Sequence, residues 1–286
     1  MHETMIAFVR KVFCVTLVAA SSLISAAAVD RPNVLVILTD DQGSRDLGCY
    51  GAKDLATPAI DALAAGGVKL EGFYSAAPVC CPSRAGLLTG KHPWEVGVAN
   101  NIGLSAEGMP SKHKTMAEYF REAGYTTAHI GKWHLGHHED TLPNGQGFDF
   151  SFGHHGGCID NYSHYFYWNG PNKHDLYENG KEVHHNGKFF PDLMCHKALD
   201  FTQKASKPFL IYYAMNLPHY PYQAPEKWID HYKDMQMPRK LYAAAVSAID
   251  ESIAELFDGL KKQGKFDNTI IVFMSDHGHS TEVRAF

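Results

Sequence analysis

The segment from Cys80 to Arg84 combines side chains that can perform nucleophilic chemistry. It reads Cys-Cys-Pro-Ser-Arg, and the residues that follow predict a helix with Pro82 in its first turn and Gly90 at its end. Cys80 then stands just before a helix N-terminus, where free backbone N–H groups favour anions. Arg84 lies four residues further and can reach the same anion. Cys80 is therefore a candidate nucleophile for a substrate that carries an oxyanion, and a buried Cys-Cys pair without chemistry is the alternative.

Polar side chains also follow four predicted strands at the point where each strand ends. They are Asp40 and Asp41, Lys132 and His134, His219, and Asp276 and His277. Singly, each has an ordinary explanation as a turn, a helix cap or a solvated loop residue. In open parallel sheets, however, ligands bind outside the carboxyl ends of the strands. We therefore interpret the four segments as parts of one shared site.

The acidic members of this set predict a bound cation. Asp40, Asp41 and Asp276 would concentrate negative charge that is costly unless a cation neutralises it. Oxygen ligands favour calcium or magnesium over zinc or copper, and His277 leaves manganese open. Adjacent histidines occur at 137–138, 154–155 and 184–185. Their spacing does not resemble a structural zinc site, so we interpret them as solvated loop residues.

Strands and helices alternate along the chain in an order that can position these residues. Continuous apolar runs predict buried strands at 33–39, 126–130, 208–215 and 269–274, with a weaker strand at 68–73. Helical patterns lie between them at 59–65, 116–123, 193–205 and 241–260. This order predicts an α/β fold with a mainly parallel sheet and helices on both faces.

Residues 137–190 differ from the rest because they are rich in Gly, Asn, His and aromatic residues. A long irregular insert in a compact α/β domain is usually functional or disordered. The aromatic content favours an ordered insert that lines a pocket.

Composition narrows the class of protein. The chain has 286 residues, of which 45% are hydrophobic and 20% are charged. This apolar content excludes an intrinsically disordered chain. Lys and Arg number 26 against 31 Asp and Glu, and no basic block is present, which argues against a nucleic-acid partner.

Residues 1–28 have the pattern of a secretory signal peptide. Arg10 and Lys11 precede a short apolar run that ends in Ser-Ala-Ala-Ala. The run is too short for a membrane span, so we predict an exported protein, periplasmic or secreted, with no membrane span after signal removal. The mature domain is expected at 29–286, with the loop-rich insert at about 137–190.

Five of the six cysteines remain after removal of the signal peptide. An odd number is unusual for an oxidising compartment. If one cysteine has another fate, the other four can form two disulfides or stay free. Five are too few for a disulfide scaffold at this size, so the fold must rest on its core.

These motifs together resemble the type I, formylglycine-dependent sulfatase family, within the alkaline phosphatase-like fold. The resemblance extends from Arg31 to the C-terminus, and its segments occur in the order typical of the family. The segments are Arg-Pro-Asn at 31–33 through Asp-Asp at 40–41, Cys-x-Pro-Ser-Arg at 80–84 with Leu-Leu-Thr-Gly at 87–90, Gly-Tyr at 124–125 through Gly-Lys-Trp-His-Leu-Gly at 131–136, His219 among prolines, and Ser-Asp-His-Gly at 275–278.

The resemblance implies that Cys80 is oxidised to formylglycine by a separate modifying enzyme. One hydroxyl of the hydrated aldehyde then attacks the sulfur of a sulfate ester, and the second hydroxyl loses its proton and expels sulfate. The implied ligands of one divalent cation are Asp40, Asp41, the modified Cys80, Asp276 and His277. Asp276 also helps to deprotonate the nucleophile.

The same resemblance implies roles for five further residues. Arg84 steadies the formylglycine, and Lys132 binds the sulfate oxygens. His134 takes the proton of the second hydroxyl, and His219 acts near the leaving oxygen as a general acid. His164, in an Asn-Tyr-Ser-His segment, is expected to contact the substrate.

The resemblance therefore implies a sulfatase that hydrolyses a sulfated small molecule or glycan. The histidine- and aromatic-rich insert and the habit of the family favour a carbohydrate. A phosphate or phosphonate ester hydrolase on the same scaffold is one alternative. An inactive fragment or a sulfated-glycan-binding protein is the other, because family members continue past Phe286 with another substrate-binding lysine and a small C-terminal domain. The chain is thus expected to be truncated at its C-terminus.

Overall fold

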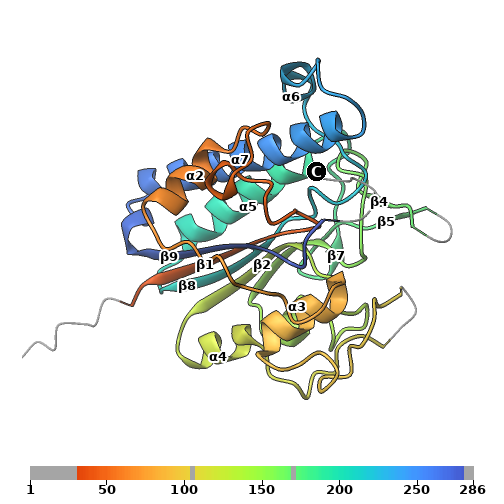
Figure 1. Cartoon of the computed structure of the whole chain (residues 1–286). Helices are drawn as coiled ribbons and strands as arrows, with labels where there is room; N and C mark the ends of the chain where they lie inside the picture. The colour runs from red at the N-terminus through yellow and green to blue at the C-terminus, as the bar shows by residue number, and fades with distance from the viewer. Residues whose placement is uncertain (1–30, 104–106, 169–171, 280–286) are drawn as a thin grey trace, which may run out of the picture. The chain divides into compact units, whose positions relative to one another are not determined.

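A mixed sheet of seven strands forms the centre of the chain from residue 33 onwards (Figure 1). The computed structural model describes residues 31–103, 107–168 and 172–279. The signal peptide predicted at 1–28 lies outside the described residues. The strand order is β7-β6-β3-β2-β8-β1-β9, in which β6 is antiparallel to both neighbours. The remaining neighbouring pairs are parallel.

The four strands expected from continuous apolar runs are all present in this sheet. They are β1 (Asn33–Thr39), β2 (Thr126–Lys132), β8 (Phe209–Ala214) and β9 (Thr269–Ser275). Such runs form parallel strands because helices cover both faces and leave little place for polar side chains. The predicted α/β fold with a mainly parallel sheet is confirmed.

Helices pack on both faces of the sheet. The described helices are α2 (Pro58–Ala65), α3 (Cys80–Thr89), α4 (Met116–Glu122), α5 (Phe190–Lys204), α6 (Glu226–His231) and α7 (Arg239–Lys262), with short 3-10 helices η2 (Gly48–Tyr50), η3 (Pro143–Gln146) and η4 (Phe266–Asn268). Figure 1 shows α2, α5 and α7 on one side of the sheet and α3 and α4 on the other. The four predicted helices are confirmed, with ends that differ by at most three residues.

Side chains of the central strand β1 alternate between two apolar cores. Leu35 and Ile37 belong to the core that contains apolar residues of α5 and α7. Val36 and Leu38 belong to a second core, which contains apolar residues of α3. Successive side chains of a strand point to opposite faces, so each core fixes the orientation of this strand.

The strand register places the ends of β1, β2, β8 and β9 at one edge. Thr39 of β1 pairs with Ser275 of β9, and Leu38 pairs with Ala214 of β8. Ala214 also pairs with Gly131 of β2. The residues that directly follow these pairs therefore emerge side by side, as parallel strands predict.

The segment 137–190 is more regular than we expected. Its strand β3 (Phe150–His154) is parallel to β2 within the central sheet, and β6 (Tyr177–Glu178) and β7 (Lys181–Glu182) extend that sheet. A separate two-stranded sheet contains β4 (Tyr165–Phe166) and β5 (Lys173–His174). The solvated state predicted for the pair 154–155 is wrong, because His154 ends a central strand and both side chains are buried.

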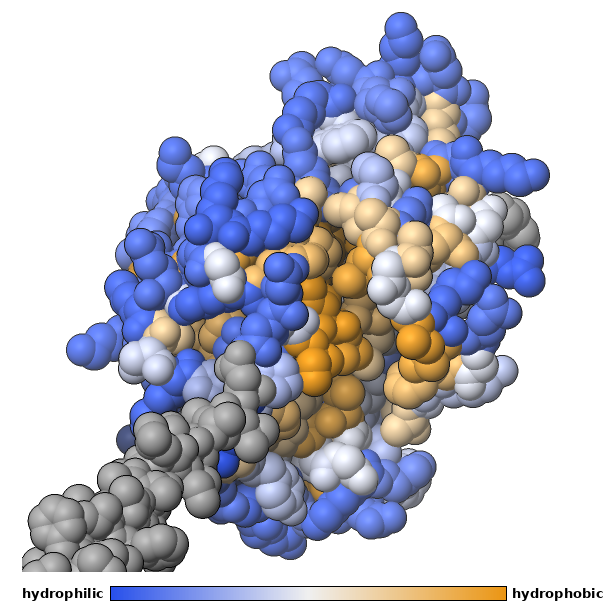
Figure 2. All heavy atoms as spheres, turned by 90° about the vertical axis from the view of Figure 1, so that its left-hand side faces the viewer, coloured by the Kyte–Doolittle hydropathy of each residue, from blue (hydrophilic) through white to orange (hydrophobic). Residues whose placement is uncertain are grey.

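The weak strand expected at 68–73 is wrong. No strand forms there, and Val68 is 87% exposed and Phe73 is 61% exposed. An apolar run of this length forms a strand only where the fold supplies a partner and a covered face. Ile270 of β9, the edge strand of the described sheet, is also 52% exposed. Figure 2 shows further apolar side chains gathered in the middle of one face, so the described residues leave apolar surface uncovered.

Two further properties considered for the sequence are disulfide bonds and membrane-spanning helices. Within the described ranges all five cysteines are free, so these residues contain no disulfide. None of the described helices has the length and apolar character needed to cross a membrane.

Candidate active site

Cys80 is the first residue of α3 and is 6% exposed. The helix starts two residues before Pro82 and ends at Gly90, whose φ of +65° lies in the left-handed region as predicted for a helix end. The Sγ atom of Cys80 lies 3.6 Å from Oδ1 of Asp40 and 3.5 Å from Nε2 of His277. The helix N-terminus and two strand ends therefore meet at this sulfur.

The thiol of Cys80 is not activated by its surroundings. Burial raises the pKa of Cys80 well above its ordinary value, and Lys132 only partly offsets this effect. Reactive cysteine thiolates have lowered pKa values. The unmodified side chain is therefore a protonated thiol, which disfavours the interpretation of Cys80 itself as a thiolate nucleophile.

Arg84 and Lys132 are buried cations that hold the carboxylates of the site. Nζ of Lys132 lies 2.6 Å from Oδ2 of Asp40. The guanidinium of Arg84 bridges two carboxylates, at 3.1 Å from Oδ1 of Asp40 and 3.1 Å from Oδ2 of Asp276. Burial alone would raise the pKa of Asp40, but Lys132 and Arg84 outweigh burial and hold that pKa well below its ordinary value.

Negative charge at the site exceeds what these two cations neutralise. Burial and the neighbouring Asp40 raise the pKa of Asp276 well above its ordinary value. The same two causes raise the pKa of Asp41 to about 6. Oδ1 of Asp41 lies 3.2 Å from Nε2 of His277, so the third carboxylate of the site contacts an imidazole.

A divalent cation fits this donor set. One ligand atom from each of Asp40, Cys80, Asp276 and His277 lies within 4.8 Å of the others, and Asp41 contacts His277. Carboxylate oxygens with one imidazole suit calcium, magnesium or manganese. Burial, and then the neighbouring Asp40, raises the pKa values of Asp41 and Asp276, and a bound cation would favour the ionised form of both.

His134 lies beside this cluster in a fixed conformation. Its φ of +56° is left-handed, and its backbone N–H donates to the carbonyl of His155 over 3.2 Å. Burial and Lys132 lower the pKa of His134 well below its ordinary value, so its imidazole is neutral. A Cβ atom on Gly157 would lie 2.7 Å from this ring, which shows how closely the backbone packs against it.

His219 reaches the cluster from the loop after β8. Its Nε2 lies 3.7 Å from Oδ2 of Asp41, and its Nδ1 lies 2.6 Å from the carbonyl oxygen of Tyr220. The ring is partly exposed and therefore accessible from solvent. The structure thus brings together the predicted residues Asp40, Asp41, Cys80, Arg84, Lys132, His219, Asp276 and His277, with His134 beside them.

His164 does not belong to this cluster in the structure. The residue is 0% exposed, its Nε2 lies 3.0 Å from the carbonyl oxygen of Lys188, and its ring packs against Phe190. The imidazole is enclosed by the insert, and the substrate contact of His164 stays a prediction. The sequence pattern identified the residue type but gave no measure of its burial.

Two residues of the signature have contacts that the sequence did not reveal. Ser83 Oγ donates to the backbone carbonyl of Asp276. Sγ of Cys81 donates to the carbonyl of His134 over 2.9 Å and accepts from the backbone N–H of Ile102 over 3.0 Å. Both residues therefore fix the backbone next to proposed site residues. Their position inside the Cys-x-Pro-Ser-Arg segment was the only available signal.

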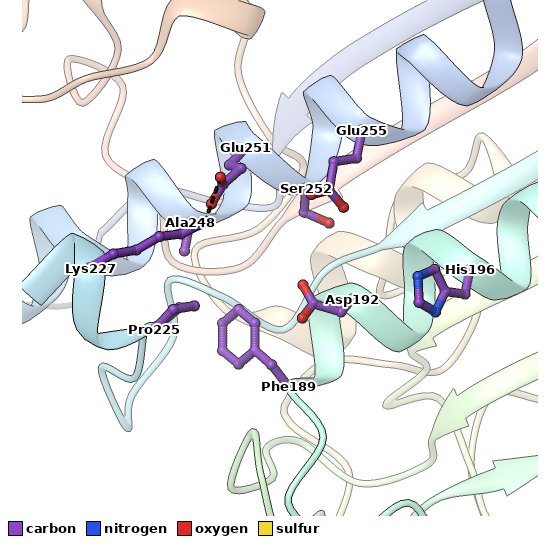
Figure 3. A pocket seen from close by; sticks show the side chains of 9 residues that line it. All are labelled: Phe189, Asp192, His196, Pro225, Lys227, Ala248, Glu251, Ser252 and Glu255. Atoms are coloured by element: carbon purple, nitrogen blue, oxygen red, sulfur yellow. Dashed lines mark hydrogen bonds and ion pairs between the residues drawn. The ribbon is translucent and has the colours of Figure 1, made fainter. Parts of the chain in front are cut away.

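A separate cavity of about 560 Å³ lies between α5, α6 and α7 (Figure 3). Its lining includes Asp192, His196, Lys227, Glu251 and Glu255. The carboxylate of Glu251 is paired with Lys227 over 2.6 Å. None of the residues around Cys80 lines this cavity, so it is distinct from the cluster described above.

Comparison with known proteins identifies relatives of this chain. The Sulfatase family model matches residues 32–285. Arylsulfatase J of Mus musculus is 36% identical over 261 residues, which cover 88% of this chain and 43% of that protein. N-acetylgalactosamine-6-sulfatase of Canis lupus familiaris is 34% identical over 286 residues, which cover 91% of this chain and 52% of that protein. The chain therefore spans about half the length of these curated relatives.

A solved structure shares the fold as well. Ps i-CgsB in complex with k-i-k-neocarrahexaose has a TM-score of 0.83 and 34% sequence identity to this chain. The match covers 90% of this chain and 60% of that one.

Proposed function

Because the chain belongs to the sulfatase family, we propose that it hydrolyses sulfate esters at the cluster around Cys80. One observation carries the proposal. Cys80 stands at the N-terminus of α3, 3.6 Å from Asp40 and 3.5 Å from His277, at the edge where the parallel strands end. A formylglycine at position 80 would thus lie among cation ligands and beside two buried basic side chains.

Formylglycine, when present, supplies a hydroxyl nucleophile, and a bound divalent cation lowers the cost of ionising it. The chain's own residues then position charge around the sulfate. Lys132 has three N–H donors, of which one contacts Asp40, so the others can bind sulfate oxygens. Arg84 holds Asp40 and Asp276 at a fixed spacing and so positions two cation ligands.

Two histidines would move protons in the proposed reaction. His134 is a neutral imidazole and can accept a proton next to the cluster. His219 is partly exposed and contacts Asp41 at 3.7 Å, so it can donate a proton to the leaving alcohol oxygen from the solvent side. The two roles need imidazoles on different sides of the cluster, and the two rings differ in burial, with His134 buried and His219 partly exposed.

We propose a sulfated carbohydrate as the substrate. The relatives include an N-acetylgalactosamine-6-sulfatase and a protein bound to a neocarrahexaose. The proposal includes calcium as the cation, because the donor set is dominated by carboxylates. It also includes export through the signal peptide at 1–28 and oxidation of Cys80 by a formylglycine-installing enzyme. The mature domain would then be 29–286.

The test is to express the chain with a formylglycine-installing enzyme and to analyse the tryptic peptide 70–84, which contains Cys80 and Cys81. An aldehyde at Cys80 together with multiple turnover of an aryl sulfate is the expected result. Cys80→Ala is the matched control and should show neither. Faster turnover of the matching aryl phosphate would favour the phosphate ester hydrolase instead. Two unmodified thiols without turnover would favour a binding protein or an inactive fragment.

A further inference from the structure

A group of metal-ligating side chains lies inside the insert, apart from the Cys80 cluster. It consists of His174 on β5, Glu182 on β7 and His184, which follows β7. One ligand atom from each lies within 4.8 Å of the others. Together we call these three residues the insert triad. We propose that the insert triad binds a transition-metal ion of the zinc class.

Existing contacts already bring the insert triad together. Nδ1 of His174 lies 2.8 Å from Oε1 of Glu182. The rings of His174 and His184 stack with centroids 4.3 Å apart and an interplanar angle of 26°. Donor atoms around a tetrahedral zinc ion lie about 3.4 Å apart, given metal–ligand distances of about 2.0–2.2 Å. A rotation of the exposed His184 ring and a small separation of Glu182 from Nδ1 of His174 would therefore complete three ligands.

Burial of His174 supports a role beyond packing. The residue is 6% exposed, and Nδ1, the ring nitrogen that faces the insert triad, lies 2.8 Å from Oε1 of Glu182. Burial restricts this ring, so little side-chain freedom is lost when an ion binds at Nδ1. Glu182 and His184, in contrast, are exposed, which leaves the open coordination position to water.

The donor set selects the class of metal. Two imidazoles and one carboxylate are ligands that zinc accepts in sites with three protein ligands. Calcium prefers six to eight oxygen ligands, and the insert triad offers one carboxylate. The Cys80 cluster, with its several carboxylates, has the opposite preference. The two groups should therefore bind different ions in the same solution.

The insert triad is connected to the proposed active site through one residue. Asp175 directly follows His174, and its carboxylate accepts from the backbone N–H groups of His155 and Gly156 over 3.1 Å and 2.8 Å. His155 in turn accepts from the backbone of His134. A metal ion that fixes His174 would thus stiffen the segment that supports His134.

The sequence alone did not identify this group. We interpreted the pair 184–185 as solvated, because adjacent histidines do not have zinc-site spacing. The ligands instead come from three different positions, and only the pairing of β6 with β7 brings Glu182 and His184 toward His174.

The experiment measures zinc bound per chain by equilibrium dialysis, with the protein stripped of metal and then saturated with calcium. One zinc ion per chain is expected, and cobalt in its place should give the visible absorption of a tetrahedral site. Glu182→Gln and His184→Ala alter exposed side chains and should each weaken zinc binding at least about tenfold, since even second-shell changes have effects of this size. Zinc should also raise Tm, because it binds the folded chain.

Two variants serve as controls for location. His138→Ala removes an exposed histidine of the same insert and should bind zinc like the parent chain. His277→Ala alters the Cys80 cluster and should also retain the ion. Unchanged zinc affinity in both Glu182→Gln and His184→Ala would overturn the proposal. Loss of zinc in His277→Ala would assign the ion to the other cluster and overturn it as well.

Discussion

Replacement of Gly157 by alanine should displace the imidazole of His134. A methyl group at position 157 would lie 2.7 Å from Cε1 and 2.8 Å from Nε2 of that ring, whereas ordinary contacts begin at 3.4 Å. The ring or the backbone must therefore move by at least about 0.7 Å, the difference between 3.4 and 2.7 Å. His134 has little freedom to yield, because it is buried and its backbone N–H and carbonyl are both hydrogen-bonded.

The displacement predicts a loss of rate together with a modest loss of stability. A misplacement of about 1 Å can cost about 100-fold in rate, so we expect kcat for a sulfate ester to fall about 10- to 100-fold. KM should change less, because His134 is proposed to accept a proton rather than to hold the substrate. Overpacking of this kind costs about 1–3 kcal/mol, which lowers Tm by several degrees without unfolding the chain at 25 °C.

Steady-state kinetics of the formylglycine-containing chain, with circular dichroism at the assay temperature, measure both effects. Gly72→Ala is the control, because a methyl group at that position would meet nothing within 4 Å. Parent-level kcat in Gly157→Ala would refute the proposed role of His134. A loss of rate that matches the fraction of unfolded protein would refute it too.

Three further predictions concern stability. Arg84→Met removes the cation that bridges two buried carboxylates, so Tm should fall by the equivalent of about 3–5 kcal/mol, with a smaller loss in calcium than in EDTA. Cys81→Ala should cost about 1 kcal/mol in urea unfolding because the N–H of Ile102 loses its acceptor, and Cys81→Ser should cost less. Burial raises the pKa of Asp250 to about 6, so the folded chain keeps a proton that the unfolded chain releases above about pH 4. The stability from this group is present below pH 4 and is lost as pH rises through 6. In Asp250→Asn the free energy of unfolding in urea should therefore change less between pH 4 and 6 than in the parent chain.

Each of these three stability predictions would be contradicted by a specific result. An unchanged Tm for Arg84→Met would mean that the carboxylates do not need the guanidinium. Equal unfolding free energies for Cys81→Ala and Cys81→Ser would exclude the hydrogen bond as the cause. A profile of Asp250→Asn that keeps the parent slope between pH 4 and 6 would show that other groups produce it.

Three of the strands that carry the site, β1, β2 and β8, could be predicted because they are buried on both faces. Such strands read as continuous apolar runs, and β1 was predicted with the bounds that the structure has. Parallel order then requires the strand ends to meet, which is why Asp40 and Asp276 could be assigned to one site from 236 residues apart. The register of Thr39 with Ser275 is the physical basis of that assignment.

The insert could not be predicted in the same way. Strand β3 reads Phe-Ser-Phe-Gly-His, which has no continuous apolar run, and it is a strand because β2 and β6 supply partners on both sides. The burial of His164 and the grouping of His174 with Glu182 depend on the same tertiary contacts. Local sequence patterns contain no information on such pairings.

Two residues of the site have a backbone conformation that residues other than glycine disfavour, and their side chains give the functional reason. Asp41 and His134 have φ values of +60° and +56°, a left-handed conformation that costs about 1–2 kcal/mol per residue other than glycine. Glycine at either position would relieve this cost but would remove the carboxylate or the imidazole. The strain persists because neighbours fix it: the backbone N–H of Asp41 donates to Asp276, and that of His134 donates to His155. The backbone conformations that orient these two side chains are therefore ones that residues other than glycine disfavour. For this reason a sequence can identify the residues of this site more readily than their geometry.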